Sequence, residues 1–121
     1  MSKENSIAYQ KAFHFAVKIV KLYKYFLTEK KEFVLSKQIL KSGTSIAANI
    51  REALEGQSKK DFIAKLSIAL KEAGETEYWL ELFIASEILE KEEVIKLLTE
   101  VKEIIRILNS IIHTSKDGLS L

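Results

Sequence analysis

The stretch SGTSIAANIREALEG, residues 42–56, gathers small and polar side chains in a chain otherwise rich in Lys, Glu, Leu and Ile. From Ser42 to Asn49 the only large side chain is Ile46. Small side chains let a neighbouring helix approach closely, because the distance between helix axes depends on the residues at the contact. Ser42, Ser45 and Asn49 recur every three to four residues, which places them on one helical face. The stretch therefore predicts a closely packed helix with polar groups on its inward side.

The composition is that of one globular helical domain. A chain of 121 residues fits a single domain that can bury a sizeable core. Hydrophobic residues make up 47% and charged residues 30%, which is typical of soluble globular proteins and not of disordered chains. With no proline and four glycines the chain has few helix breakers, so we expect long helices.

Apolar residues recur at helical spacing in four segments separated by short polar connections. We place these helices at about residues 5–27, 33–54, 58–89 and 91–114, followed by a frayed tail at 115–121. Ser58 and Asp61 form a capping-box pattern at the start of the third helix, and Gly56 suits a left-handed residue after the second. Long helices with short connections predict an all-α fold, an antiparallel up-down-up-down four-helix bundle.

The inward polar residues need partners, because buried polar groups in folded proteins are hydrogen-bonded. Glu77 falls on the apolar stripe of the third helix, where a carboxylate is costly unless it is paired. We expect Ser42, Ser45, Asn49 and Glu77 to form a buried polar network that fixes the register of the second and third helices. The alternative is an active or ligand-binding site built from these residues, which requires an open pocket beside them.

The third helix carries a second apolar stripe in addition to its core stripe. The second stripe consists of Ile68, Tyr78, Trp79, Leu82 and Leu89. A helix that is apolar around most of its circumference is buried on two sides. In a chain of this size the second side predicts contact with another subunit. The alternative is that these side chains only overhang the edge of the bundle.

Five short motifs between residues 42 and 80 are more specific than a helical pattern. They are SGTSI (42–46), ANIREA (48–53), SKKDF (58–62), IALKE (68–72) and ETEYWL (75–80), and YQKAF (9–13) precedes them. Through these motifs the chain resembles the bacterial four helix bundle protein family. That family includes the 23S rRNA intervening-sequence proteins and, more distantly, the accessory variability determinants of diversity-generating retroelements.

The resemblance implies a small antiparallel bundle that assembles into a ring-shaped homo-oligomer, a pentamer. It also implies a bacterial, cytoplasmic protein whose molecular role is mostly unassigned. The retroelement relatives act as basic, nucleic-acid-binding partners of a reverse transcriptase, so the resemblance makes a reverse transcriptase a candidate protein partner. It offers no catalytic residues to transfer.

The residues themselves argue against an enzyme or a metalloprotein. The chain has no cysteine and two histidines, His14 and His113, neither of which follows a Glu by three residues as in a di-iron bundle. Glycine-rich phosphate-binding motifs are absent as well. We therefore expect no catalytic residues, no metal and no cofactor. No apolar run reaches the length of a membrane span, so we expect no membrane partner.

Charge is distributed unevenly along the chain. Residues 1–71 hold 14 Lys and Arg against 6 Asp and Glu, and residues 72–121 hold 5 against 11, so the two parts carry +8 and −6. The basic residues outside the core stripes of the first two helices are Lys11, Lys18, Lys21, Lys24, Lys37, Lys41 and Arg51. Such faces fit sequence-independent binding of RNA or DNA phosphates. The alternative is an adaptor or structural oligomer in which these residues are solvated or pair with neighbouring Glu.

Overall fold

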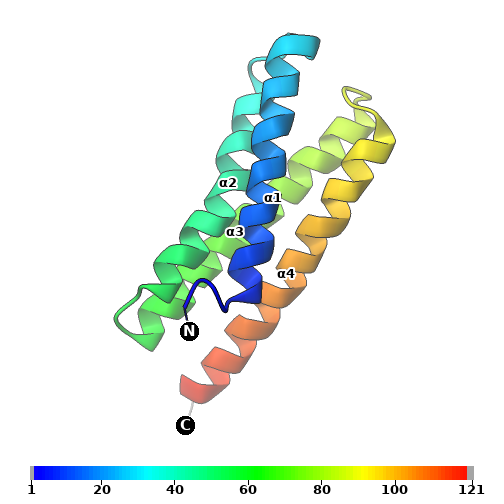
Figure 1. Ribbon diagram of the computed structural model, residues 1–121. Helices are drawn as coiled ribbons and strands as arrows, with labels where there is room; N and C mark the ends of the chain where they lie inside the picture. Colours follow the sequence, from blue (N-terminus) through cyan, green and yellow to red (C-terminus); the bar gives the residue numbers. More distant parts are fainter. Residues whose placement is uncertain (1, 120–121) are drawn as a thin grey trace.

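The computed structural model describes residues 2–119, and this part of the chain holds four α-helices, one π-helical turn and no strand. The elements are α1 (Ile7–Tyr25), the π-helical turn η1 (Phe26–Lys30), α2 (Leu35–Leu54), α3 (Lys59–Ala85) and α4 (Lys91–Leu119). Successive helices run antiparallel, and the α1–α2 hairpin packs against the α3–α4 hairpin (Figure 1). The predicted all-α, four-helix architecture is confirmed.

Serine side chains cap the first and third helices. Ser6 Oγ accepts a hydrogen bond from the backbone N–H of Tyr9 at 3.1 Å, so α1 begins at Ile7 and not at residue 5. Ser58 Oγ accepts from the backbone N–H of Asp61 at 3.1 Å, which confirms the predicted cap. Each serine satisfies an N–H group that has no partner within its helix.

The connection between α1 and α2 is more ordered than predicted. The segment expected to be a polar connection, residues 28–32, is instead largely taken up by the π-helical turn that extends α1. The turn ends at Lys31, whose φ of 53° is left-handed. The Glu32 carboxylate then accepts from the backbone N–H groups of Val34, Leu35 and Ser36 at 3.2, 2.9 and 2.8 Å. This carboxylate serves as the cap of α2, which therefore begins at Leu35 and not at residue 33.

The turn between α3 and α4 comes earlier than predicted. Glu87 is left-handed, with φ 58°. Its N–H donates to the Ile84 carbonyl at 3.1 Å, and the N–H of Ile88 donates to the Phe83 carbonyl at 3.2 Å. These two bonds form a Schellman motif, which ends a helix by reversing the chain. The predicted helix over residues 58–89 was therefore too long at its C-terminal end.

Two more expectations about helix ends are wrong. Gly56 does not have a positive φ, and the left-handed positions among residues 2–119 are taken by Lys31 and Glu87 instead. The tail expected to fray stays helical through residues 115–119. Residues 120 and 121 of that predicted tail lie outside the described residues.

The core runs along the axis of the bundle and draws on all four helices. Its fully buried large side chains include Phe15, Ile19, Phe26, Ile46, Leu66, Leu80, Phe83, Ile104 and Leu108. Phe26 of η1 meets Phe83 of α3 edge-on, with ring centroids 5.2 Å apart. A Cβ placed on Gly43 would lie 2.9 Å from both Cγ1 and Cγ2 of Ile19. The close packing predicted for residues 42–49 is thus confirmed at Gly43, where the neighbour is α1.

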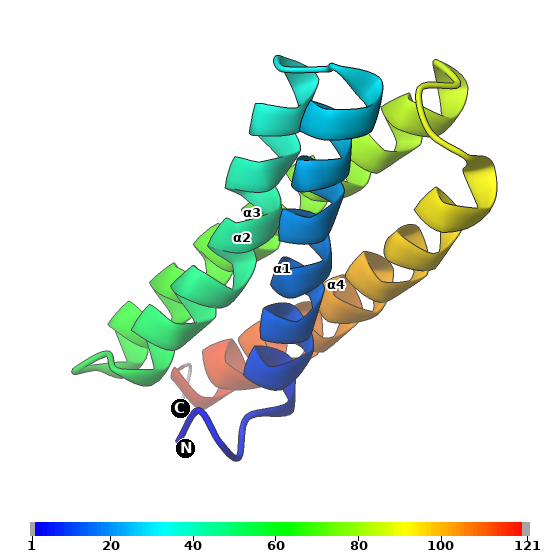
Figure 2. The same ribbon diagram turned by 45° about the horizontal axis from the view of Figure 1, so that its top comes forward.

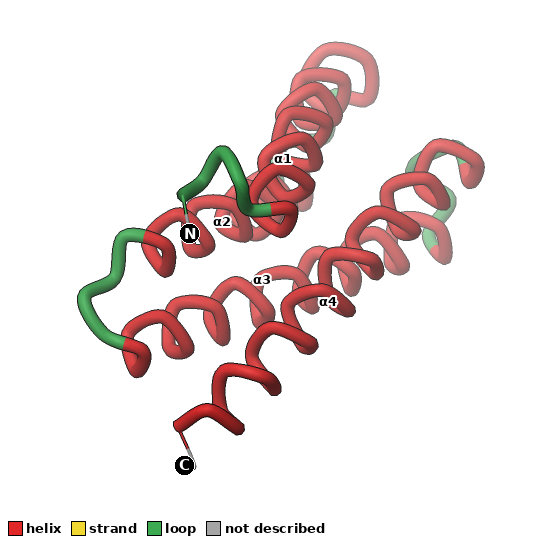
Figure 3. Tube along the Cα trace, turned by 60° about the horizontal axis from the view of Figure 1, so that its bottom comes forward, coloured by secondary structure: helices red, strands yellow, loops and turns green. Residues whose placement is uncertain are grey.

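The two hairpins diverge toward the end of the bundle opposite the chain termini (Figures 2 and 3). Consistent with this, α1 contacts α4 much less than it contacts α2. A groove of about 610 Å³ lies between α1 and the start of α4. Leu22 and Tyr25 line it from one side and Leu89 and Val94 from the other, with Lys21 among the charged residues beside them.

Candidate nucleic-acid interface

The polar seam between α2 and α3 differs from the predicted network in its partner. Ser42 and Thr76 are both fully buried, and their hydroxyl oxygens lie 2.9 Å apart. Thr76 Oγ1 also lies 2.8 Å from the Glu72 carbonyl oxygen. Thr76 rather than Glu77 therefore joins α3 to α2. The Glu77 side chain is turned away from that of Thr76 by about 100° around α3.

The other members of the predicted network do not join it. Ser45 Oγ donates to the Lys41 carbonyl at 2.6 Å, and Asn49 Nδ2 donates to the Ser45 carbonyl at 2.8 Å, so both bond within α2. Glu77 faces α4, where its carboxylate lies 4.0 Å from Lys102 Nζ. The grooves found between α1 and α4 are not lined by any of these residues. The structure favours the packing interpretation of this seam over a ligand site.

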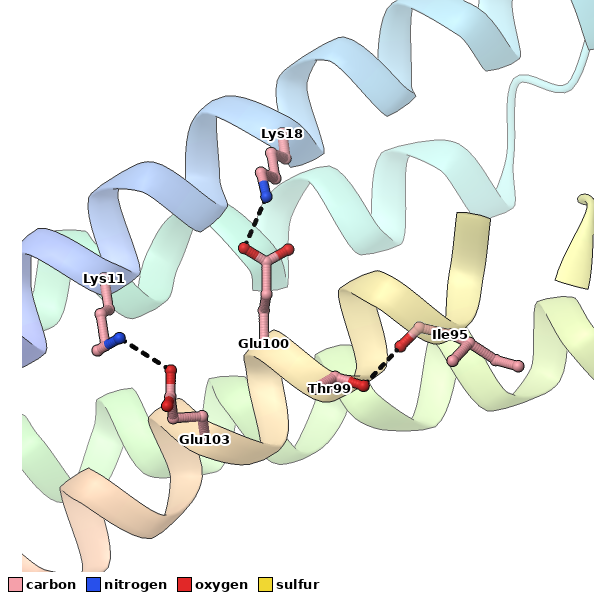
Figure 4. Close-up of polar contacts among 6 residues, drawn as sticks. All are labelled: Lys11, Lys18, Ile95, Thr99, Glu100 and Glu103. Atoms are coloured by element: carbon pink, nitrogen blue, oxygen red, sulfur yellow. Dashed lines mark hydrogen bonds and ion pairs between the residues drawn. The ribbon is translucent and has the colours of Figure 1, made fainter. Parts of the chain in front are cut away.

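All seven predicted basic residues are exposed, but three of them are already paired. Lys11 Nζ lies 3.0 Å from Glu103 Oε1, and Lys18 Nζ lies 2.7 Å from Glu100 Oε1, so both lysines bridge α1 to α4 (Figure 4). Arg51 Nε lies 3.5 Å from Oε1 of Glu55, the C-cap residue of α2. The predicted basic face of α1 is therefore partly neutralised by acidic residues of the C-terminal half.

The remaining four lysines belong to one end of the α1–α2 hairpin. Within residues 2–119 no ion pair involves Lys21, Lys24, Lys37 or Lys41. Lys21 and Lys24 lie in the last turns of α1, and Lys37 and Lys41 lie in the first turns of α2. Because α1 and α2 are antiparallel neighbours, these four lysines lie at the end of the hairpin where α1 is connected to α2.

The turn itself adds two lysines that sequence reasoning missed. Lys30 and Lys31 are exposed and stand between the two pairs of helical lysines. We define the basic end as Lys21, Lys24, Lys30, Lys31, Lys37 and Lys41. The signal was the run EKKE at residues 29–32, which looked only like a polar connection. Residues 21–41 hold six lysines and two glutamates, Glu29 and Glu32.

The Glu32 carboxylate is directed at the backbone N–H groups that begin α2. Burial acts to raise the pKa of Glu32, but hydrogen bonds from the N–H groups of Leu35, Ser36 and Val34 outweigh it and lower the pKa. The carboxylate therefore stays ionised and is held against the first turn of α2. Its charge neutralises the positive end of the α2 helix dipole rather than a neighbouring lysine.

A known protein family matches most of the chain. Residues 4–110 match the family described as 23S rRNA-intervening sequence protein. The chain belongs to this family. It is similar to a crystal structure of a protein with unknown function from the S23 ribosomal protein family of Bacteroides thetaiotaomicron, with 56% identity and a TM-score of 0.87. The similarity covers 92% of this chain and 98% of that chain. No curated protein matches the chain.

Two apolar stripes lie on the surface of α1 and α3. On α3, Ile68 and Tyr78 are exposed and Trp79 and Leu82 are half-buried. Leu89 was wrongly included with them, because the Schellman turn carries it into the core, where it is 9% exposed. We keep the name α3 stripe for Ile68, Tyr78, Trp79 and Leu82.

The α1 stripe was missed from the sequence. Phe13, Val17 and Val20 are 53%, 40% and 38% exposed. They recur at helical spacing on the side of α1 away from the buried Phe15 and Ile19. The available signal was this second periodicity, which the stronger core stripe of the same helix obscured.

Among residues 2–119, no three His, Cys, Asp or Glu side chains are grouped so that they could hold a metal ion. None of the described helices combines the length and the apolar character that crossing a membrane requires.

Proposed function

We propose that this protein is a non-enzymatic homo-oligomer of the bacterial cytoplasm that binds RNA or DNA through the basic end of its α1–α2 hairpin. The observation that carries the proposal is the set of unpaired, exposed lysines at one end of the molecule. Lys21, Lys24, Lys37 and Lys41 have no ion pair within residues 2–119, whereas Lys11 and Lys18 are held by glutamates of α4.

Unpaired lysines favour phosphate binding for a physical reason. A lysine that meets a phosphate releases a condensed counterion, and this release supplies most of the sequence-independent affinity. A lysine already bonded to a carboxylate must first give up that partner. Assembly into a ring would repeat the basic end around an axis and would add the fields of the copies.

Charge reversal tests this proposal. We expect the double variant Lys37→Glu/Lys41→Glu to lose binding to a labelled RNA or DNA duplex in gel-shift assays at low salt. The matched control is Lys59→Glu/Lys60→Glu at the start of α3, which changes the net charge equally at exposed lysines beside the α2–α3 connection, the end of α2 away from the basic end. Wild-type protein that binds neither RNA nor DNA at low salt contradicts the proposal, and so does equal loss in the two double variants.

The oligomeric part of the proposal rests on the two apolar stripes. Exposed apolar patches of this kind mark interaction sites. The stripes differ in composition, so a contact between the α1 stripe of one copy and the α3 stripe of the next is head-to-tail. Such contacts close into rings when the rotation permits, and the family resemblance implies five subunits.

Mixing two complementary variants tests the head-to-tail contact. Phe13→Asp disables the α1 stripe, and Tyr78→Asp disables the α3 stripe. Each variant alone should be a monomer by light scattering, whereas an equimolar mixture should form a one-to-one heterodimer through the two intact stripes. A monomeric wild type refutes the oligomer. Oligomeric Phe13→Asp protein refutes the use of the α1 stripe.

A structural oligomer or protein–protein adaptor without nucleic-acid binding is the second candidate. The ion pairs Lys11–Glu103 and Lys18–Glu100 favour it, because they show basic residues used inside the fold. It predicts a stable oligomer whose affinity for RNA and DNA stays undetectable at low salt.

A further inference from the structure

Two aromatic side chains are exposed at the basic end and are not explained by the fold. Tyr25, the last residue of α1, is 43% exposed, and Phe33, in the connection to α2, is 53% exposed. Lys30 Nζ lies 6.0 Å from the centre of the Tyr25 ring. Lys24 precedes Tyr25, Lys31 follows the π-helical turn η1, and both lysines are exposed as well. Aromatic rings are thus interleaved with cations at one end of the hairpin.

The turn that carries these rings is anchored on both sides. Phe26, which follows Tyr25, is fully buried and packs on Phe83 of α3. Glu32, which precedes Phe33, is held by three backbone N–H groups of α2. Because each ring adjoins an anchored residue, its position is largely set before any ligand arrives, which lowers the entropy lost on binding.

A lysine occupies a backbone position that normally favours glycine. Lys31 has φ 53°, and a side chain there costs conformational energy that glycine does not incur. Glu87 has the matching conformation, φ 58°, at the end of α3. The two hairpin turns therefore carry the same left-handed geometry with opposite charges. The side chain at position 31 is a cation at the same end as both rings.

We propose that the basic end binds single-stranded nucleic acid, with bases stacked on Tyr25 and Phe33 and phosphates beside Lys24, Lys30 and Lys31. The inference rests on the proposed function and adds the strand state of the ligand and the residues that select it. Exposed rings among lysines match the chemistry of single-stranded binding, in which stacking on a ring accepts any base. Bases in a duplex are already stacked on one another, so the rings gain little there.

The test compares a labelled single-stranded oligothymidine with a duplex of equal length, using fluorescence anisotropy and full-length protein. We expect Tyr25→Ala/Phe33→Ala to weaken single-strand binding at least about thirtyfold, because two stacked bases are lost and each contributes about fivefold or more. Duplex affinity should change less than twofold, because the lysines remain. Ile95→Ala is the control for truncating an apolar side chain, since Ile95 is 44% exposed on α4.

A second pair of variants separates charge from backbone strain. Lys31→Gly and Glu87→Gly both relieve a left-handed side chain, so neither should unfold the protein. Lys31→Gly should weaken single-strand binding severalfold, whereas Glu87→Gly should leave it unchanged or slightly stronger. Circular dichroism and light scattering check that fold and subunit number are retained in all variants.

The outcomes distinguish this inference from the proposed function. Unchanged single-strand affinity in Tyr25→Ala/Phe33→Ala refutes ring stacking while lysine-dependent duplex binding keeps the proposed function. A change in subunit number on removing the rings assigns them to a protein contact and also refutes the inference. Wild-type protein that binds neither ligand refutes both. Selective loss of single-strand binding in Tyr25→Ala/Phe33→Ala supports both ring stacking and the proposed function.

Discussion

Substituting Gly43 by alanine tests how closely α1 and α2 approach each other. The added Cβ would lie 2.9 Å from Cγ1 and Cγ2 of Ile19 and 3.3 Å from its Cβ. Ile19 is fully buried, and its branched side chain is stiff at χ1, so it cannot turn away cheaply. One of the two helices must shift to accept the methyl group. We therefore expect Gly43→Ala to destabilise the protein.

The magnitude follows from two opposing effects. Alanine is favoured over glycine inside a helix by about 0.8–1 kcal/mol. Overpacking a filled core costs about 1–3 kcal/mol. The net expectation for Gly43→Ala is destabilisation by up to about 2 kcal/mol. Gly74→Ala is the matched control on α3, because its Cβ would meet nothing within 4 Å. Gly74→Ala should keep the whole gain in helix propensity and therefore stabilise the protein by about 0.8–1 kcal/mol.

Urea denaturation followed by circular dichroism measures both effects. All variants are compared at one protein concentration, because assembly links stability to concentration. In a double-mutant cycle, Ile19→Ala removes Cγ1 and Cγ2, the two atoms nearest the added methyl group, so the two substitutions should couple by about 1–3 kcal/mol. If Gly43→Ala stabilised the protein as much as Gly74→Ala, the close approach of α1 and α2 would be refuted.

Two further predictions concern polar groups in and beside the core. Thr76→Val should destabilise by about 1 kcal/mol, because it removes the bond to Ser42. Adding Ser42→Ala should recover part of this loss, and full additivity in urea denaturation would contradict the buried pair. The pKa of Glu32 is lower in the folded than in the unfolded protein, so its stabilisation is present above the unfolded pKa and is lost as pH falls through the folded pKa. Glu32→Gln should therefore make the free energy of unfolding fall less steeply as the pH is lowered. An unchanged pH dependence would contradict the role of the Glu32 carboxylate as the cap of α2.

The helices could be predicted from the sequence because their apolar residues repeat with the helical period. Their ends were less predictable. Lys31 and Glu87 take left-handed conformations that glycine usually signals, while Gly56 does not. The cap of α2 is the Glu32 carboxylate, which stands among lysines and looked like part of a charged connection. These ends are set by local backbone bonds that the hydrophobic pattern does not encode.

The candidate site was predictable in its chemistry but not in its pairing. All seven basic residues are exposed as their positions outside the core stripes predicted. Whether each one is free depends on the register between helices far apart in sequence, as Lys18 and Glu100 show. The partner of Ser42 was missed by one position, because Thr76 and Glu77 lie on the two sides of the same core stripe and the sequence alone does not say which side faces α2. Tertiary contacts determine both which lysines are paired and which residue bonds to Ser42.

The central claim is that the unpaired lysines of the basic end bind phosphate, whereas Lys11 and Lys18 serve the fold. The most direct test is the salt dependence of duplex binding for Lys37→Gln/Lys41→Gln and for Lys11→Gln/Lys18→Gln. Each lost phosphate contact lowers the slope of log affinity against log salt by about 0.9, so the first pair should lower it by about 1.8. The second pair should leave the slope unchanged, because Glu103 and Glu100 already hold those lysines. Equal reductions in both variants, or no salt dependence in the wild type, would contradict the account.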